Sequence, residues 1–320
     1  MTRDVTNRVT NATSSTMAAI QRGHSPKRDT MRPRTPVLVL ILSAVAPAVL
    51  FGQTGQQPAA TPASTVLTVF RESVKVGKGG AHDDLENAWA AAVAAAKAPP
   101  FIAMAAVTGP AETWYLASFT NWSEYEKSTD ASNSSPALAA IDKKFRAQED
   151  EYLSDARLMT LRVRPELGYG PPADLANMRY VSVTRISVRP GHNGEFDELR
   201  KTITAAHQSA KMTDQYSIWQ ATNGAPAGTY YLFVSRKSLG EIEEGAALHN
   251  GAAYLAALGG PEGQKKLDAL AAGAILSQQT DLFEFKPGQS VPPEEWIKAN
   301  PNMWQRKPPA VKKTAPEVKK

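Results

Sequence analysis

Two histidines lie on the apolar faces of expected helices. His207 follows Ile203 at a spacing of four residues, and His249 follows Ala246 at a spacing of three. An imidazole in such a place can bind a haem iron or another ligand, or it can move a proton. It can equally lie at the edge of the core and bond a backbone carbonyl. Both histidines are therefore candidate ligand-binding residues, although the sequence gives neither of them a partner at a fixed spacing.

Two arginines occupy the middle of expected strands. Arg71 opens the segment RESV and Arg185 opens the segment RISV, at the same place of a repeated pattern. A guanidinium buried in a sheet needs a partner. That partner is either the anionic group of a ligand, which a guanidinium can bind with two hydrogen bonds, or a carboxylate on a neighbouring strand. For Arg185 the carboxylate expected nearby is Glu284. Both arginines are candidate ligand-binding residues.

Two aromatic residues complete the candidate set. Trp114 in the segment TWYLASF and Tyr230 in the segment TYYLFVS occupy equivalent positions of two expected strands. Aromatic side chains there would suit an apolar pocket with a few polar groups. The alternative is a filled core in which these residues need no ligand and both arginines are ion-paired.

Several other kinds of site find no support. The chain has no cysteine, which excludes disulfides, thiolate metal sites and a cysteine nucleophile. No two histidines stand four residues apart and no histidine has a carboxylate at ligand spacing, so we expect no metal site. His82 and His192 lie in or just after turns, where we expect them to be exposed. The segment GKGG lacks the frame of a phosphate-binding loop, and no serine lies in a G-x-S-x-G motif.

The positive charge of the chain lies at its ends. The 320 residues carry a net charge of +5, but residues 53–285 hold 21 Lys and Arg against 26 Asp and Glu. A basic nucleic-acid-binding face is therefore not expected. The basic tail suits solubility or weak attraction to an anionic surface.

A signal peptide is expected near the start of the chain. Arg32 and Arg34 precede a fifteen-residue apolar run, Val37–Phe51. That run is shorter than the roughly 20 apolar residues that span a bilayer, and it has the length of a signal-peptide core. Residues 1–52 are thus a leader, with Met31 as a candidate true start. We expect an exported protein, periplasmic or extracellular, with no membrane span left after cleavage; an uncleaved anchor is the alternative.

The chain repeats itself after 114 residues. The segments VFRESVKVGKGGAHDDL and VTRISVRPGHNGEFDEL, which begin at Val69 and Val183, are identical at eight of seventeen positions. Strand, helix and turn patterns predict the order βαββαβ in each half, the ferredoxin-like plan. The expected organisation is a linker at 53–64, a first repeat at 65–165, a linker at 166–178, a second repeat at 179–287 and a disordered tail at 288–320.

The strands indicate why there are two repeats. A sheet with one wet face alternates apolar and polar residues, whereas the third strands carry large apolar side chains on both faces. Helices cover only one of those faces. The other needs a second sheet, which predicts two repeats packed sheet to sheet as an intramolecular α+β barrel. Such a chain can be a monomer or a homodimer.

This pattern resembles the dimeric α+β barrel superfamily, which includes NIPSNAP-type, antibiotic-biosynthesis monooxygenase-like and haem-handling proteins. The resemblance rests on the segments RESVKVGKGG and RISVRPGHNG, on the element order and on the duplication. It implies the fold, but no catalytic motif of the superfamily can be carried over to residues of this chain.

Three functions agree with these observations. The leading one is an exported protein that binds a small apolar or weakly acidic molecule or a protein partner, without a cofactor and without chemistry of its own. The alternatives are an oxygenase-type enzyme, either cofactor-independent or haem-using, and a cell-envelope interaction protein that uses its basic tail.

Export generates the first testable prediction. Mass spectrometry of the mature protein should show an N-terminus between about residues 47 and 56, because cleavage follows the apolar core of a signal peptide. Intact protein beginning at Met1 or Met31 in the cytoplasm would contradict this expectation.

Overall fold

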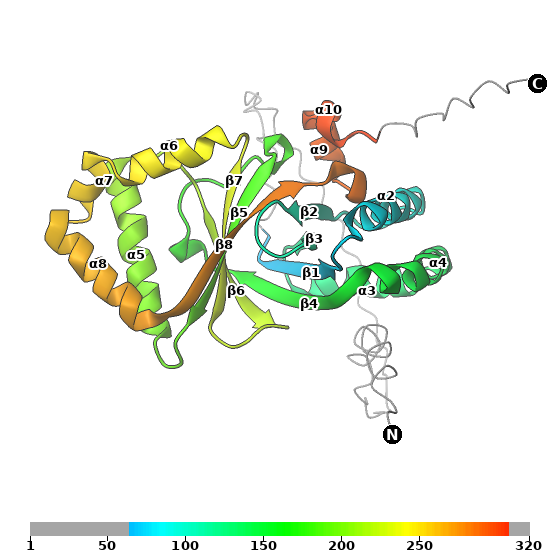
Figure 1. Cartoon of the computed structure of the whole chain (residues 1–320), viewed down its shortest axis with the longest axis horizontal. Coiled ribbons are helices and arrows are strands. Elements are labelled where there is room, and N and C mark those ends of the chain that lie inside the picture. Colours follow the sequence, from blue (N-terminus) through cyan, green and yellow to red (C-terminus); the bar gives the residue numbers. More distant parts are fainter. Residues whose placement is uncertain (1–63, 307–320) are drawn as a thin grey trace, which may run out of the picture. The chain divides into compact units, whose positions relative to one another are not determined.

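The structure is a computed structural model that describes residues 64–306 (Figure 1). The expected leader, most of the first linker and the last fourteen residues of the tail lie outside the described residues. The first repeat comprises β1 (Val66–Val74), α2 (Gly79–Ala95), β2 (Ile102–Ala106), β3 (Glu112–Phe119), α3 (Trp122–Asn133), α4 (Pro136–Tyr152) and β4 (Leu153–Val163). The short helices η1 (Pro165–Leu167) and η2 (Leu175–Asn177) connect it to the second repeat.

The second repeat has the same order of elements, with one helix more. It comprises β5 (Tyr180–Val188), α5 (Asn193–Ala210), β6 (Ser217–Asn223), β7 (Thr229–Arg236), α6 (Gly240–His249), α7 (Ala252–Ala257), α8 (Gly260–Ala274) and β8 (Ile275–Phe285). β4 and β8 begin earlier than their apolar segments predict. Their first halves are polar and carry no strand pattern, but they pair with β1 and β5.

The eight strands form a closed antiparallel barrel in the order β1-β3-β2-β8-β5-β7-β6-β4. β2 pairs with β8 and β4 pairs with β6, so the two repeats are joined by backbone hydrogen bonds as well as by packing. No strand of this barrel has a free edge. Helices of the first repeat lie on one side of the barrel and helices α5 to α8 on the opposite side (Figure 1). The predicted α+β barrel of two ferredoxin-like repeats is confirmed.

Equivalent residues of the two repeats also share backbone conformations with positive φ. Gly77 and Gly191, at equivalent turns after β1 and β5, have φ of 80° and 85°. Lys97 and Lys211, at the equivalent ends of α2 and α5, have φ of 58° and 51°. Glycine is favoured in the left-handed region because it has no Cβ, which explains why both turns keep this residue.

Large side chains fill the barrel. The Trp114 ring lies 5.9 Å from the ring of Tyr231 and 4.8 Å from the ring of Phe283, centroid to centroid. These three side chains come from β3, β7 and β8, so both repeats contribute to one interior core. The buried residues of this core are Leu67, Val69, Ile102, Met104, Trp114, Met159, Leu161, Met178, Val181, Val183, Tyr231, Phe283, Phe285 and Trp304.

Residues 288–306, the first part of the expected disordered tail, belong to the described residues. This segment forms η3 (Pro287–Gln289), α9 (Glu294–Ala299) and α10 (Pro301–Trp304). Trp304 is 1% exposed, packs against Phe285, and donates its indole N–H to the Ala176 carbonyl at 2.8 Å. Burying a tryptophan in the barrel core offsets the entropy lost in ordering a short polar segment.

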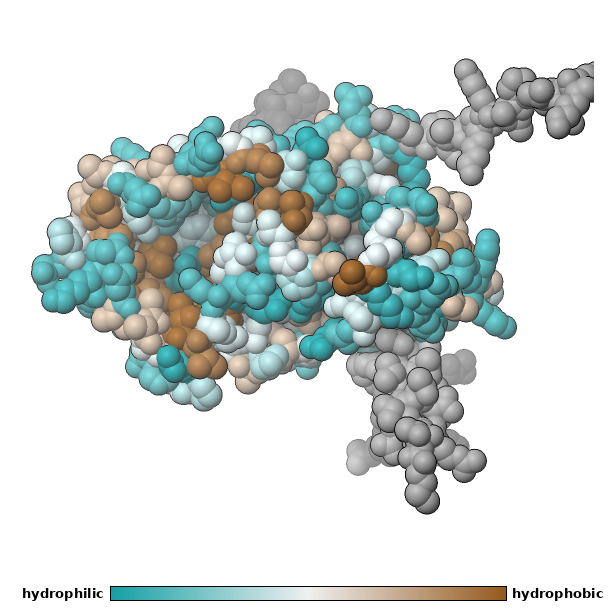
Figure 2. Space-filling model, viewed as in Figure 1, coloured by the Kyte–Doolittle hydropathy of each residue, from teal (hydrophilic) through white to brown (hydrophobic). Residues whose placement is uncertain are grey.

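The surface is not uniform. Exposed apolar side chains include Leu239, Ile242, Leu255 and Leu276, all in or beside α6, α7 and β8. Figure 2 shows hydrophobic side chains gathered over this side of the molecule, whereas the side that carries α4 is mostly hydrophilic. Within residues 64–306 no helix has the length and apolar character needed to cross a membrane.

The shared interior core generates a stability prediction. Replacing Trp114 by Ala should lower the free energy of unfolding by about 3–5 kcal/mol, because a large buried ring is removed and a cavity remains. Trp122, which is 45% exposed, is the matched control, and its replacement by Ala should change stability by less than about 0.5 kcal/mol. Urea unfolding of both variants measures the difference; equal losses would contradict the packing described here.

Candidate functional site

The structure divides the six predicted site residues among three places. Arg71 and Arg185 line one cavity of about 170 Å³ together with Ser73, Glu112, Asp155 and Arg157. Trp114 lies beside this cavity, with the guanidinium carbon of Arg71 4.8 Å from its ring centroid. Arg71 is ion-paired with Glu112 at 2.6 Å. Nε of Arg185 is buried and has no hydrogen-bond partner among the described residues.

The residue equivalent to Trp114 in the second repeat differs from the expected one. Arg71 pairs with Trp114 across β1 and β3, while Arg185 pairs with Tyr231 across β5 and β7. Tyr231, not Tyr230, is therefore the structural equivalent of Trp114. A shift of one residue reverses the face of every side chain in a strand, and Tyr230 instead packs against Phe196 of α5 with ring centroids 4.5 Å apart.

The expected ion pair between Arg185 and Glu284 is not formed. In the register of β5 and β8, Arg185 lies opposite Gln279. Glu284 lies opposite Tyr180 and pairs with Arg179, with 3.2 Å between Nη2 and Oε1. The strand pairing was predicted, but the register needed the structure.

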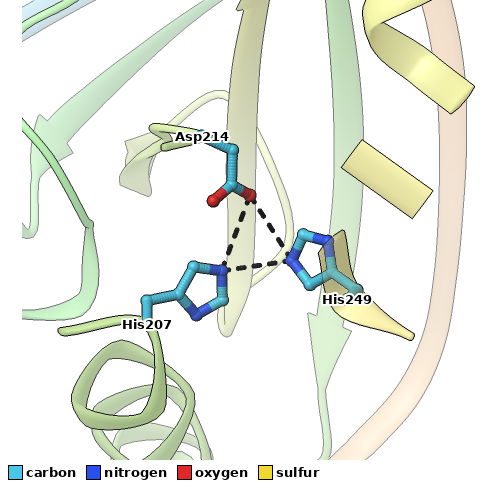
Figure 3. Close-up of side chains that lie close together, drawn as sticks. All are labelled: His207, Asp214 and His249. Atoms are coloured by element: carbon cyan, nitrogen blue, oxygen red, sulfur yellow. Dashed lines mark hydrogen bonds and ion pairs between the residues drawn. The ribbon is translucent and has the colours of Figure 1, made fainter. Parts of the chain in front are cut away.

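His207 and His249 are brought together, and a third residue joins them (Figure 3). His207 lies in the last turn of α5, and His249 is the last residue of α6. Asp214 belongs to the connection between α5 and β6. The two Nε2 atoms are 3.1 Å apart, and Asp214 Oδ2 is 3.6 Å from that of His207 and 3.4 Å from that of His249.

The backbone fixes the orientation of both imidazoles. Nδ1 of His207 donates to the Ile203 carbonyl at 2.8 Å, and Nδ1 of His249 donates to the Gly245 carbonyl at 2.7 Å. Since a carbonyl only accepts, the proton of each neutral ring must be on Nδ1. Both Nε2 atoms then present lone pairs toward each other and toward the carboxylate. This is the tautomer in which histidine binds metals, with the other nitrogen held by a carbonyl.

Three lone pairs that converge repel one another unless a positive charge lies between them. The edges of the triangle, 3.1, 3.4 and 3.6 Å, match the about 3.3–3.4 Å between ligand atoms that each lie 2.0–2.1 Å from a tetrahedral ion. An extra proton on one imidazole is the alternative source of positive charge. The arrangement can therefore hold either a divalent metal ion or a proton.

The carboxylate of Asp214 is ionised and has an oxygen that is free among the described residues, so it can bind a cation. Burial raises its pKa, but a proton carried by His207 or His249 on the side of the carboxylate outweighs burial and brings the pKa below its usual value. Its second oxygen, Oδ1, is buried without a hydrogen-bond partner among the described residues. The carboxylate is thus ionised at neutral pH and only partly satisfied by the protein.

Three tyrosines surround the histidine pair. The rings of Tyr169, Tyr216 and Tyr254 lie 5.0, 5.3 and 5.0 Å from the ring of His207. His207 is 1% exposed, whereas the side chain of His249 is 41% exposed. A cation between them would be shielded by aromatic rings on one side and open to solvent on the other.

A haem fits these residues less well than a small ion. A haem ligand needs a free histidine nitrogen that faces room for the macrocycle. Nε2 of His207 faces His249 and Asp214 instead. Neither the cavity beside Arg71 nor a hollow lined by residues of α5 near Asp197 and Lys201 includes His207 or His249.

Sequence reasoning found the two histidines but missed their partner. Asp214 lies 35 residues before His249 in the chain, so no ligand spacing reveals it. His82, expected to be exposed, is 1% exposed and contacts Glu72. Glu72 and His82 thus form a second buried polar contact. Comparison of the two repeats could have indicated it, because the second repeat has the apolar residues Ile186 and Phe196 at these two positions.

The chain matches no protein-family model, and no curated protein matches it. Solved structures do match. A monooxygenase-like protein from Fusobacterium nucleatum subsp. nucleatum is 12% identical, with 70% of this chain and 94% of that chain covered and a TM-score of 0.47. An anthrone oxidase-like protein is 12% identical, with 70% and 92% covered and a TM-score of 0.46. A variant of chlorite dismutase from Candidatus Nitrospira defluvii is 10% identical, with 74% and 95% covered and a TM-score of 0.40.

These matches correct the leading functional expectation. We expected a binding protein without chemistry of its own, whereas the matching structures are monooxygenase-like, oxidase-like and chlorite dismutase proteins. At such low identity the likeness itself extends to the fold alone. The chain is an α+β barrel of two ferredoxin-like repeats, similar in fold to monooxygenase-like proteins and chlorite dismutase.

Proposed function

We propose that this protein is an oxygenase-type enzyme that uses one divalent transition-metal ion held by His207, Asp214 and His249. The observation that carries the proposal is the convergence of two Nε2 atoms and one carboxylate oxygen, 3.1 to 3.6 Å apart, with both Nδ1 atoms bonded to carbonyls. Two histidines and one carboxylate with open coordination positions are the ligand set of non-haem iron(II) oxygenases.

The protein residues have distinct tasks in this proposal. The carbonyls of Ile203 and Gly245 hold the imidazole rings so that both Nε2 atoms face the ion. Asp214 supplies negative charge that offsets part of the charge of the ion. A bound iron(II) ion would supply the coordination positions at which dioxygen and substrate meet. His207 and the surrounding tyrosines exclude water from the inner side.

The surroundings indicate the class of substrate. The solvent side of the site is the exposed edge of His249 at the end of α6. The exposed apolar residues Ile242 and Leu255 belong to α6 and α7, and Tyr254 of α7 contacts His249 with ring centroids 5.2 Å apart. Apolar and aromatic side chains of this kind favour a small, mostly apolar substrate.

Export and assembly belong to the proposal as well. Residues 32–52 have the charged and apolar segments of a signal peptide, so the enzyme would act in the periplasm or outside the cell. The likeness to NIPSNAP-type proteins remains an expectation, as do a monomeric or homodimeric state and contact of the basic tail with an anionic surface.

Metal binding tests the proposed site directly. The full chain, stripped with a chelator, should bind cobalt(II) with a visible spectrum characteristic of nitrogen and oxygen ligands. Replacement of His249 by Ala should remove one equivalent of bound cobalt. The affinity loss should exceed the about 10–100-fold that removal of an outer-shell partner costs, because a direct ligand is lost. His192, also 41% exposed on its side chain, is the matched control, and its replacement by Ala should leave binding unchanged.

Two outcomes would contradict this function. If cobalt, zinc and iron(II) all bind the His249→Ala and His207→Ala variants as they bind the wild type, the cluster holds a proton and not a metal. A titration with haemin separates the other alternative. A Soret shift that is lost in either histidine variant would indicate a haem protein, whereas we expect no histidine-dependent shift.

A further inference from the structure

A second cluster of ligand-type side chains is buried in the first repeat. Glu72 lies on β1, and His82 and Glu86 lie on α2. They are 2%, 1% and 5% exposed. Nε2 of His82 is 2.9 Å from Glu72 Oε2, and the Tyr115 hydroxyl donates to Glu86 Oε2 at 2.7 Å. Ligand atoms of the two glutamates and the histidine all lie within 4.8 Å of one another.

Packing of the helix on the sheet does not require these polar residues. With the 114-residue offset of the repeat, the positions of Glu72 and His82 are occupied by Ile186 and Phe196 in the second repeat. Both are buried in an apolar cluster between α5 and its sheet. Apolar residues of similar volume usually stabilise such an interface at least as well as buried charges do. The polar residues of the first repeat therefore need another explanation.

A third position of this cluster also differs between the repeats. It holds Arg200 in the second repeat but Glu86 in the first. Glu86 thus brings a second carboxylate to the cluster where the second repeat has a cation, and His82 is a basic side chain that contacts Glu72, at 2.9 Å. A bound divalent ion would displace the protons of these acids and offset the charge of the two carboxylates.

We propose that Glu72, His82 and Glu86 bind a second divalent metal ion between β1 and α2. Two carboxylates and one imidazole suit first-row ions such as manganese(II), iron(II) or zinc(II), whereas magnesium and calcium prefer oxygen ligands alone. An ion bound at about 2.1 Å places its ligand atoms about 3.0–4.2 Å apart, and the observed limit of 4.8 Å leaves only a small side-chain adjustment. Glu149 of α4 is a further carboxylate that acts on Glu72.

The surroundings assign this ion a structural role. Tyr115 fixes Glu86, and the rings of Phe101 and Trp89 lie 6.0 and 6.1 Å from the ring of Tyr115, centroid to centroid. Structural metal sites are closed, whereas catalytic sites keep an open position. The ion would join strand and helix in the first repeat, on the opposite side of the barrel from α5 and α6 (Figure 1). This proposal does not depend on the function proposed for His207.

The repeat supplies a matched variant for the test. Replacing Glu72 by Ile and His82 by Phe gives the first repeat the residues that the second repeat carries. The measurement uses the His249→Ala chain as background, so that loss of the other site cannot be confused with loss of this one. Metal content after equilibration with manganese(II) or zinc(II) is measured by elemental analysis, and the melting temperature is measured with and without the ion.

The His249→Ala chain should retain one equivalent of metal, and its melting temperature should rise by several degrees when the ion is added, because an ion that binds only the folded state stabilises it. The Glu72→Ile, His82→Phe variant should remain folded, bind no metal in this background and show no such rise. Glu86→Gln, which keeps the shape of the side chain, should weaken binding at least about 10-fold. If the repeat-matched variant does not fold, Glu86→Gln decides the matter.

Three results would overturn the proposal. The first is a His249→Ala chain that binds no manganese or zinc. The second is equal metal content in the His249→Ala chain with and without the two replacements. The third is unchanged affinity in Glu86→Gln. Any of these would mean that the acids of the cluster share protons and hold no ion.

Discussion

The whole structure depends on one constraint, which is that each repeat makes a sheet with large apolar side chains on both faces. Helices cover the outer face, and only the other repeat can cover the inner one. The barrel meets this demand with an interior core in which Trp114 of one repeat contacts Tyr231 of the other. Pairing of β2 with β8 and of β4 with β6 satisfies the remaining edge hydrogen bonds. Separation of the repeats would therefore expose apolar surface and unpaired backbone together.

The interior of the barrel is filled by large side chains, so groups of polar side chains that could bind a ligand lie elsewhere. The cavity at Arg71 and Arg185 is only about 170 Å³ and is lined in part by the exposed side chains of Asp155 and Arg157, and its neighbour Trp114 is packed into the core. The two clusters of metal-ligand side chains lie instead outside the interior core, one in each repeat. They do not occupy equivalent positions, because Val93 stands at the place of His207 and Phe196 at the place of His82. The duplicated fold thus carries sites that are specific to each repeat.

The sequence predicted much of this architecture. The repeated segments, the order of elements and the barrel follow from periodicity and from the two apolar faces of the third strands. The predictions failed where contacts between distant segments decide the outcome. Alignment of the third strands makes Tyr230 the equivalent of Trp114, but the pairing with β5 gives that position to Tyr231. Trp304 anchors a segment whose composition resembles a disordered tail, because the barrel core offers it a buried place.

By itself the sequence determined that the fold is a tandem repeat, that Arg71 and Arg185 are equivalent, and that His207 and His249 lie on helices with apolar faces. Local spacing carries this information, since strand and helix periods extend over a few residues. Only the tertiary structure decided that the two histidines meet Asp214, and that His82 is buried beside Glu72 and not exposed in a turn. A metal site depends on distances of a few ångströms between side chains. Residues 42 positions apart, such as His207 and His249, acquire such a distance only when the fold brings α5 and the end of α6 together.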